Sequence, residues 1–257
     1  MIDPKENRRF LKANWREWSE SGLKTDQQKG VPRPAVEKPF DVNAELIGLV
    51  SPDKMTVGDM SLREVIAARA SRRKYTDEAL TLEELSFLLW ATQGVRSVEP
   101  AGDGLITWRT VPSGGCRHAF EAYVCVDRVD GVRPGLYRYL PIEHKLLPIA
   151  DEVTVERVAE ACCGQVFVGK AAVAFIWTAI PYRMEWRYTT RAHKTIVLDA
   201  GHVCQNLYLA AEAIGAGTCA IGAYLQEEMD ALIGVDGEDE FVIYAAPVGK
   251  VQIEFSA

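Results

Sequence analysis

Apolar residues recur at helical spacing along several parts of the chain. The longest such segment runs from His193 to Ile214, with apolar positions three and four residues apart, and ends at Gly215. Its low polarity predicts a central core helix. Two shorter helices are expected to begin after Ser61 and Thr81, because a glutamate follows each by three residues, as in a capping box. Further helices are predicted over 153–162 and 225–233, and the helix after Thr81 is expected to end at Gly94.

Other segments have the pattern of strands. Residues 121–127 alternate between the two faces, and residues 135–140 and 145–149 form a predicted hairpin or meander. The apolar runs 171–180 and 241–248 are expected to be buried strands. Since helices and strands are mixed without a regular β-α alternation, the order predicts an α+β fold.

The first 55 residues differ in pattern from the rest. Residues 7–20 place Leu11, Trp15 and Trp18 on one stripe of a predicted helix, and a polar, Pro-rich segment follows up to Pro39. The apolar stripe is too narrow to stabilise that helix alone in water. We therefore expect an N-terminal helix and an extended Pro-rich arm over 1–55, laid across the main body or a partner subunit. The main domain is expected over 56–257.

Composition limits the classes of function. With 257 residues, 48% of them hydrophobic, the chain can bury a full core, and its formal charge of -7 argues against general nucleic-acid binding. No apolar run approaches the ~20 residues that span a bilayer, and the first residues lack the pattern of a secretory signal. We therefore expect a cytoplasmic protein that binds neither nucleic acid nor membrane.

Six cysteines are scattered through the sequence, and without a secretory context we expect them to be reduced. Cys116 lies two residues before His118, and His202 lies two residues before Cys204. Either pair could belong to a metal site. However, neither has the spacing typical of zinc ligands, so no metal is expected.

The segment from Arg69 to Tyr75 contains four cations and a serine just beyond a predicted helix. Arginine forks, a lysine charge and a hydroxyl together can bind a phosphate. Taken alone, however, the residues favour a solvated basic patch, because cations at a helix C-terminus also offset the helix dipole.

Two glycine-containing segments are further candidates for ligand contact. The letters from Gly215 to Ala220 match the GxGxxG/A dinucleotide fingerprint, but the segment follows a helix instead of opening one. We therefore expect a helix end that leads into a strand, or else a loop whose backbone approaches a ligand closely. The segment Val111 to Gly115, VPSGG, either exposes backbone N–H groups or forms a plain turn.

The order of these segments resembles the flavin-dependent nitroreductase family. An RxSxR segment, a TxEEL helix ending in QG, a PSGG turn, a long LDAGHxxQNLxLAAxAxGxG helix and a PVGK strand end follow one another over about 61–252. The stretch SRRKYTDEALTLEELSFLLWATQG, together with GLYRY, resembles the subgroup that includes the dehydrogenases of thiazole and oxazole peptide maturation.

The resemblance implies a mixed, mainly antiparallel central sheet flanked by helices, in an intertwined homodimer. It also implies FMN at the dimer interface. NADH or NADPH would reduce the flavin, and a small conjugated acceptor such as a nitroaromatic, a quinone or an activated alkene would re-oxidise it in a ping-pong hydride transfer. We expect residues before about Asp41 to pack across the dimer partner and to shield the flavin.

By matched position, the resemblance also implies cofactor-binding residues in four places. The FMN phosphate and ribityl chain would be held by Arg69, Ser71 and Arg73, with Lys250 reaching the phosphate. The isoalloxazine or ribityl of the other subunit would meet Pro112, Ser113 and Gly114. The backbone that approaches the flavin ring would be that of Cys219, Ala220, Ile221 and Gly222.

One position departs from the azoline-oxidising relatives. Arg187 and Tyr188 stand where those relatives carry a Lys-Tyr pair, and an arginine stays charged at any working pH, so azoline oxidation is in doubt. The catalytic residues are unknown; Tyr188 and Arg191 are candidates for binding an anionic substrate, or are surface residues. Two alternatives to the oxidoreductase stay open: a flavin-binding or sequestering protein without turnover, and a peptide azoline dehydrogenase subunit.

Overall fold

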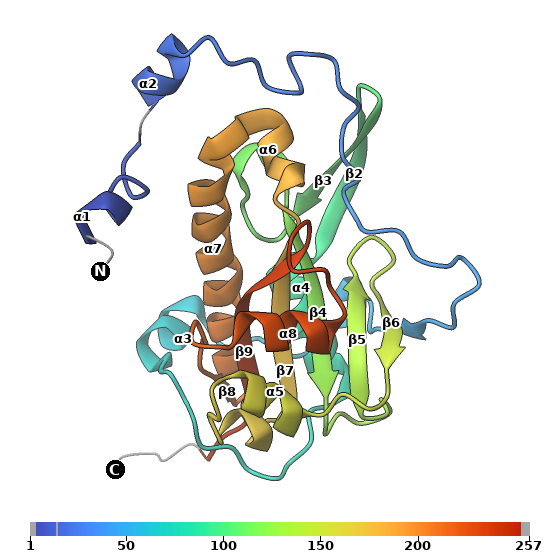
Figure 1. Cartoon of the computed structure of the whole chain (residues 1–257). Helices are drawn as coiled ribbons and strands as arrows, with labels where there is room; N and C mark the ends of the chain where they lie inside the picture. Colours follow the sequence, from blue (N-terminus) through green and yellow to red (C-terminus); the bar gives the residue numbers. More distant parts are fainter. Residues whose placement is uncertain (1–3, 14, 253–257) are drawn as a thin grey trace.

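A seven-stranded sheet forms the centre of the computed structural model, which describes residues 4–13 and 15–252 (Figure 1). Its spatial order is β1-β6-β5-β4-β7-β9-β8, and these neighbours pair antiparallel. The strands are β1 (Ile47–Gly48), β4 (Phe120–Val126), β5 (Gly135–Leu140), β6 (Lys145–Ala150), β7 (Val173–Ala179), β8 (Ala216–Thr218) and β9 (Phe241–Lys250). The predicted α+β fold with a mainly antiparallel sheet flanked by helices is confirmed.

Helices cover both faces of this sheet. On one face, α4 (Leu82–Gln93) and α7 (Ala192–Ala213) bury Leu88 and Leu207 in the same core as Val124 of β4. On the other face, α5 (Val155–Ala161) and α8 (Gln226–Ile233) pack with Cys125. Neighbouring residues of β4 thus serve two cores, because successive side chains of a strand point to opposite faces.

Both predicted capping boxes are present. The Ser61 hydroxyl accepts from the Glu64 N–H at the start of α3 (Leu62–Ala68), and Thr81 and Glu84 do the same for α4. Helix α4 ends at Gly94, as expected, where an added Cβ would lie 2.4 Å from Cδ1 of Trp90. No helix that the structure describes has the length and apolarity to cross a membrane.

Four elements were not anticipated from the pattern. They are strand β1, helix α6 (Tyr182–Tyr188), and a separate ribbon of β2 (Val95–Ala101) with β3 (Gly104–Arg109). Polar residues interrupt the apolar alternation in the ribbon, so it has no strand signal of its own. The 3-10 turns are η1 (Pro52–Lys54), η2 (Gly114–Cys116), η3 (Val168–Lys170) and η4 (Thr189–Arg191).

The helix predicted over 7–20 is wrong as one continuous element. The structure has two short helices, α1 (Pro4–Asn7) and α2 (Trp15–Glu20), joined by turns that place Leu11 outside either helix. Because α2 buries none of its residues, packing does not hold a longer helix together. We call residues 4–23 the arm helices.

We call residues 25–40 the connector. It begins with a hydrogen-bonded turn at residues 26–30, and its Pro-rich part, residues 31–40, is extended as predicted. Buried side chains of the body hold its backbone. The guanidinium of Arg109 donates to the carbonyl of Val36 at 2.9 Å, and that of Arg138 donates to the carbonyl of Lys38 at 2.9 Å. In return, the N–H of Lys38 donates to Glu121 Oε1 at 2.9 Å. The connector is therefore an integral part of the fold.

Candidate functional site

The basic segment after α3 lies directly beside the glycine segment. Ser71 forms a parallel bridge with Thr218 of β8, and the N–H of Arg72 donates to the Thr218 carbonyl at 2.9 Å. An added Cβ on Gly217 would lie 2.7 Å from the Arg72 side chain, so the close approach requires glycine there. Two segments about 145 positions apart in the sequence thus lie side by side in the fold. We call this place the phosphate end.

Tyr208 of α7 joins the parts of the phosphate end. Its hydroxyl lies 3.0 Å from Ser71 Oγ and accepts from the N–H of Ala220 at 2.8 Å. The guanidinium of Arg69 lies 5.5 Å from the centre of its ring, within reach of a cation–π contact. Sequence reasoning missed this tyrosine, because within the helical pattern it is an ordinary half-buried position.

The cations of the phosphate end differ in what they already bind. Arg72 pairs with Glu212 at 2.6 Å, and the amine of Lys250 donates to Glu84 and to the carbonyl of Ile214. Among the described residues, neither Arg69 nor Arg73 has a carboxylate within ion-pair distance. These two cations are therefore the ones that an anion would find uncompensated, whereas Lys250 is already neutralised.

The loop after β8 is only partly available for a ligand. Ile221 exchanges two backbone hydrogen bonds with Ala245, and Cys219 is buried. The Ala220 N–H is taken by Tyr208. Gly222 borders open space, since an added Cβ would meet nothing within 4 Å.

The Pro112–Gly114 turn lies elsewhere, against the first half of α7. The N–H of Gly114 donates to Asp199 Oδ2 at 3.1 Å, and an added Cβ on Gly114 would lie 2.4 Å from Cγ2 of Thr195. Ser113 Oγ accepts from the N–H of His118 at 2.9 Å. Burial raises the pKa of Asp199, while its hydrogen bonds from Ser113 and Gly114 act in the opposite direction.

The backbone that follows this turn is strained. Gly115, Cys116 and His118 have φ of 61°, 53° and 45°, in the left-handed region that side chains other than glycine rarely adopt. Strain of this kind persists at functional sites where surrounding contacts enforce it. Burial and the nearby Arg109 lower the pKa of His118 to about 3, so its ring is neutral near pH 7.

Of the two candidate catalytic residues, Tyr188 lies against the same turn, and Arg191 lies against the arm helices. An added Cβ on Gly115 would lie 2.5 Å from the Tyr188 hydroxyl. The guanidinium of Arg191 lies 4.0 Å from the ring centre of Trp15 and 3.4 Å from that of Trp18. Arg191 is therefore engaged by the arm helices. We call this region, with Pro112–Gly114, the turn end.

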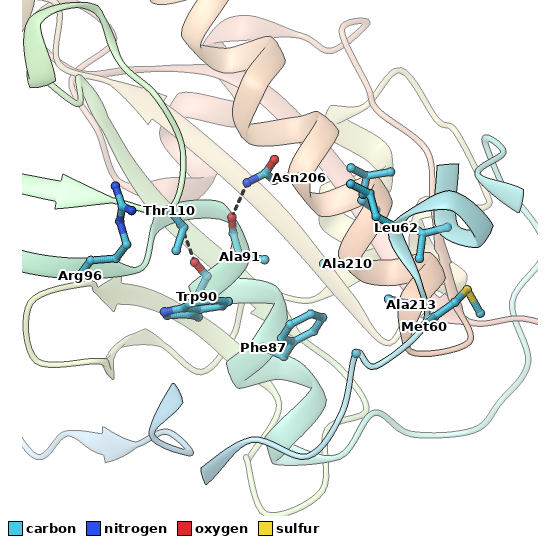
Figure 2. Close-up of a pocket in the computed structure, with 13 residues that line it drawn as sticks. Met60, Leu62, Phe87, Trp90, Ala91, Arg96, Thr110, Asn206, Ala210 and Ala213 are labelled. Atoms are coloured by element: carbon cyan, nitrogen blue, oxygen red, sulfur yellow. Dashed lines mark hydrogen bonds between the residues drawn. The ribbon is translucent and has the colours of Figure 1, made fainter. Parts of the chain in front are cut away.

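The phosphate end and the turn end do not meet within one chain. Asp199 and Tyr208, which anchor them, are nine positions apart on α7, or about 13 Å at the rise of an α-helix. Near the C-terminal end of α7, the helices α3, α4 and α7 line an open apolar groove of about 410 Å³ (Figure 2). Its lining includes Leu62, Phe87 and Trp90, and Asn206 donates to the Ala91 carbonyl at 2.8 Å.

The two cysteine and histidine pairs considered for a metal do not extend into a cluster. Within residues 4–13 and 15–252, no group of three or more His, Cys, Asp or Glu side chains is placed to hold a metal ion. All six cysteines, which lie in this part of the chain, are unpaired.

Comparison with known proteins decides the family. The sequence profile of the nitroreductase family matches residues 66–250. The chain belongs to the nitroreductase family. The protein MJ1384 of Methanocaldococcus jannaschii, also assigned to the nitroreductases, is 34% identical over 194 residues, covering 76% of this chain and 93% of that protein.

Relatives in peptide maturation match over shorter stretches. The trifolitoxin-processing protein TfxB of Rhizobium leguminosarum is 30% identical over 142 residues, which cover 53% of this chain and 38% of that protein. The Escherichia coli microcin synthetase McbBCD complex contains a chain of the same fold, with 18% identity and a TM-score of 0.59, covering 98% of this chain and 95% of that one. A solved protein of Ralstonia eutropha, also assigned to the nitroreductases, has 28% identity and a TM-score of 0.65, covering 86% of this chain and 94% of that one.

Proposed function

We propose that this nitroreductase-family protein is an FMN-dependent oxidoreductase that uses NADH or NADPH to reduce a small conjugated acceptor. The observation that carries the proposal is the phosphate end. There, the Ser71 hydroxyl lies beside β8 and the Arg69 guanidinium lies against the Tyr208 ring, while the Arg73 guanidinium, two positions further along the chain, lies 5.7 Å from the ring centre of Phe167. Neither arginine is compensated by a carboxylate among the described residues. This donor set suits a phosphate monoester dianion, because two guanidinium groups and a hydroxyl supply charge-assisted hydrogen bonds.

FMN bound in this way would supply hydride acceptance from the nicotinamide nucleotide and electron delivery to the acceptor. The protein's own part is binding and orientation. Arg69 and Arg73 would hold the phosphate, Tyr208 positions Ser71 and the Ala220 backbone, and Gly222 leaves space beside the loop. No side chain has to move a proton for hydride transfer itself.

The homodimer is part of the same proposal. Two copies paired antiparallel along α7 would bring the phosphate end of one copy beside the turn end of the other. Such pairing would also cover apolar side chains that one chain leaves exposed, such as Leu62 and Ile66 of α3 and Val197 and Leu198 of α7. Pro112–Gly114 would then meet the partner's flavin. We also propose that the protein is located in the cytoplasm.

Two measurements test the proposal. Mass spectrometry of the cofactor released from the purified protein should identify FMN, and FAD or no flavin after reconstitution would contradict the proposal. Anaerobic addition of NADH or NADPH should bleach flavin absorbance near ~450 nm. Flavin that binds but is not bleached by either nucleotide would instead favour a sequestering protein without turnover.

Arg73→Ala tests the phosphate end directly. Loss of its charge-assisted hydrogen bonds should weaken FMN binding about tenfold or more. The matched control is Lys74→Ala, which removes the neighbouring exposed cation and should change the FMN dissociation constant less than about twofold. An equal effect of the two substitutions would show that only general surface charge attracts FMN.

A peptide azoline dehydrogenase subunit is the second candidate, favoured by the match to TfxB. The structure puts Tyr188 against Gly115 and the Arg187 guanidinium 5.6 Å from the Tyr188 ring centre. An arginine makes a poor base at this place. We expect Arg187→Lys, and not the wild type, to oxidise an azoline peptide; wild-type oxidation of that peptide would reverse the order of the two candidates.

A further inference from the structure

A second pocket, of about 670 Å³, lies between the arm helices and the first turns of α7. The arm helices contribute Phe10, Lys12, Trp15 and Trp18, and α7 with the turn before it contributes Arg191 and Lys194. We call it the arm pocket. Its volume is in the range of sites that bind cofactor-sized ligands.

The arm pocket is positively charged in a chain whose net charge is -7. Four cations line it: Arg9, Lys12, Arg191 and Lys194. Among the lining residues the one carboxylate is Glu17, which pairs with Arg9. The remaining charge gives the pocket a positive potential that favours a ligand with several negative charges.

Arg191 has unused hydrogen-bonding capacity at this place. Its Nε donates to the Tyr188 carbonyl at 3.3 Å, and the two indoles cover its guanidinium. Its Nη1 is shielded from solvent and has no hydrogen-bond partner within the described residues. A shielded donor without an acceptor is costly, and an anionic oxygen would satisfy it.

The arm helices can admit such a ligand. Trp15 is 56% exposed, and α2 buries none of its residues. Segments with little buried apolar contact open at low free-energy cost. The exposed indole of Trp15 also offers a flat face on which an aromatic base can stack.

The arm pocket adjoins the turn end. Thr195 lines the pocket, and its Cγ2 is the atom that an added Cβ on Gly114 would meet. A ligand in the pocket could therefore extend from the turn that would face the flavin to the cations of the arm helices. Such a ligand needs a reacting group at one end and phosphates with an aromatic base at the other.

We propose that the arm pocket binds the adenosine-phosphate end of the nicotinamide nucleotide and that its cations favour NADPH over NADH. The inference rests on the proposed function, whose nucleotide reductant it specifies. Lys12 and Lys194 would meet the additional phosphate of NADPH, Arg191 would bind a phosphate oxygen, and Trp15 would stack on the adenine.

Isothermal titration of the full-length, flavin-loaded protein tests this without any turnover. The probes are 2′,5′-ADP, which carries the additional phosphate, and 5′-AMP, which lacks it. We expect 2′,5′-ADP to bind at least about tenfold more tightly, corresponding to a charge-assisted contact made by one ligand only. Equal affinities, or binding of neither probe, would overturn the inference.

Three substitutions separate charge from stacking and from general effects. Lys12→Gln should weaken 2′,5′-ADP about five- to tenfold and leave 5′-AMP nearly unchanged, whereas Trp15→Ala should weaken both probes. The matched control, Lys24→Gln, removes an exposed lysine next to the connector that does not line the pocket, and it should change neither. If Lys24→Gln has the same effect as Lys12→Gln, the selectivity is general surface charge and the inference fails.

The outcomes also separate this inference from the proposed function. If the protein binds FMN and is reduced equally by NADH and NADPH, with Lys12→Gln without effect, the oxidoreductase stands and the arm pocket has another role. If the protein binds no flavin but discriminates between the two probes through Lys12, the oxidoreductase fails and the pocket stands as a nucleotide site.

Discussion

The arm helices and the connector meet the body in opposite ways. The arm helices carry the larger apolar side chains, yet Phe10, Leu11 and Trp15 remain 46%, 67% and 56% exposed. The connector has few large apolar residues, yet its Val36 is buried and its backbone is bound by Arg109 and Arg138. An apolar stripe therefore does not by itself decide which segment belongs to the fold.

The cause lies in the buried charges beneath the connector. Arg109, Glu121 and Arg138 are each less than 5% exposed, so each needs hydrogen-bond partners in place of water. Backbone carbonyls and N–H groups of the connector supply several of them. The connector thus completes the hydrogen bonding of the body, whereas the arm helices cover one edge of it.

Two deletions give the strongest test of the difference between the arm helices and the connector. Removing residues 1–40 should lower the free energy of unfolding by several kcal/mol, because Arg109, Glu121 and Arg138 each lose a partner worth about 1–3 kcal/mol. Removing residues 1–20 should cost less than about 1 kcal/mol, because α2 buries no residue. Denaturant unfolding of the two truncated proteins measures both values.

The same two deletions also test whether residues 1–40 contribute to dimerisation. The sequence led us to expect that loss of residues 1–40 would raise the dimer dissociation constant and loosen FMN together. The contacts of Trp18 in the structure are made to Thr189 and Arg191 of the same chain, and packing across a partner stays a prediction. Sedimentation and flavin fluorescence that match the wild type in both truncated proteins would contradict that role.

A single buried arginine tests the connector's attachment next. Arg109 donates to Gln93 Oε1 at 2.7 Å and to the Val36 carbonyl at 2.9 Å. Arg109→Met leaves both acceptors unsatisfied and should cost about 2–4 kcal/mol in the free energy of unfolding. Arg16→Met, on the exposed α2, is the control and should stay within about 0.5 kcal/mol. Similar losses for both arginines would mean that the two segments are held alike.

The sequence predicted most helices and strands of the main domain. It did not predict the contacts that attach the connector and the arm helices to that domain. Ser61 and Thr81 predicted their helices because a capping box is local, and the long helix over 193–214 was predicted because its apolar rows are regular. Contacts between distant positions have no such signal. The partnership of Lys250 with Glu84 and the place of Tyr208 beside Ser71 follow only from the packed structure.

A change in pH should alter the stability that the connector contributes, with a smaller effect than the Arg109 substitution. Burial and the nearby Glu143 raise the pKa of Glu37 to about 7, above the ordinary 4.5, and its carboxylate accepts from the Ile142 N–H. The folded state then binds more protons than the unfolded state between these values. Stability contributed by Glu37 is present below about pH 4.5 and is lost as the pH rises towards 7.

Glu37→Gln should remove that loss, so that the mutant gains on the order of 1 kcal/mol relative to the wild type between pH 5 and 7. The difference between the two proteins isolates Glu37, because His118 contributes to both. His118, with its pKa lowered to about 3, acts in the opposite sense and destabilises the fold as the pH falls below 6.5. A difference in unfolding free energy that does not change with pH would show that Glu37 is ionised throughout.

The smallest expected effect on stability is at Trp18. Its indole N–H donates to Thr189 Oγ1 at 3.2 Å, and its ring covers Arg191. Trp18→Ala removes both contacts, but the side chain is only partly buried, so the free energy of unfolding should fall by no more than about 1 kcal/mol. Limited proteolysis should nevertheless cut the arm helices sooner than in the wild type while the connector stays protected, because opening of the arm helices need not disturb Arg109 or Arg138. If cleavage of the connector accelerates equally, the two segments unfold as one unit, and the contrast between them applies to their contacts but not to their stability.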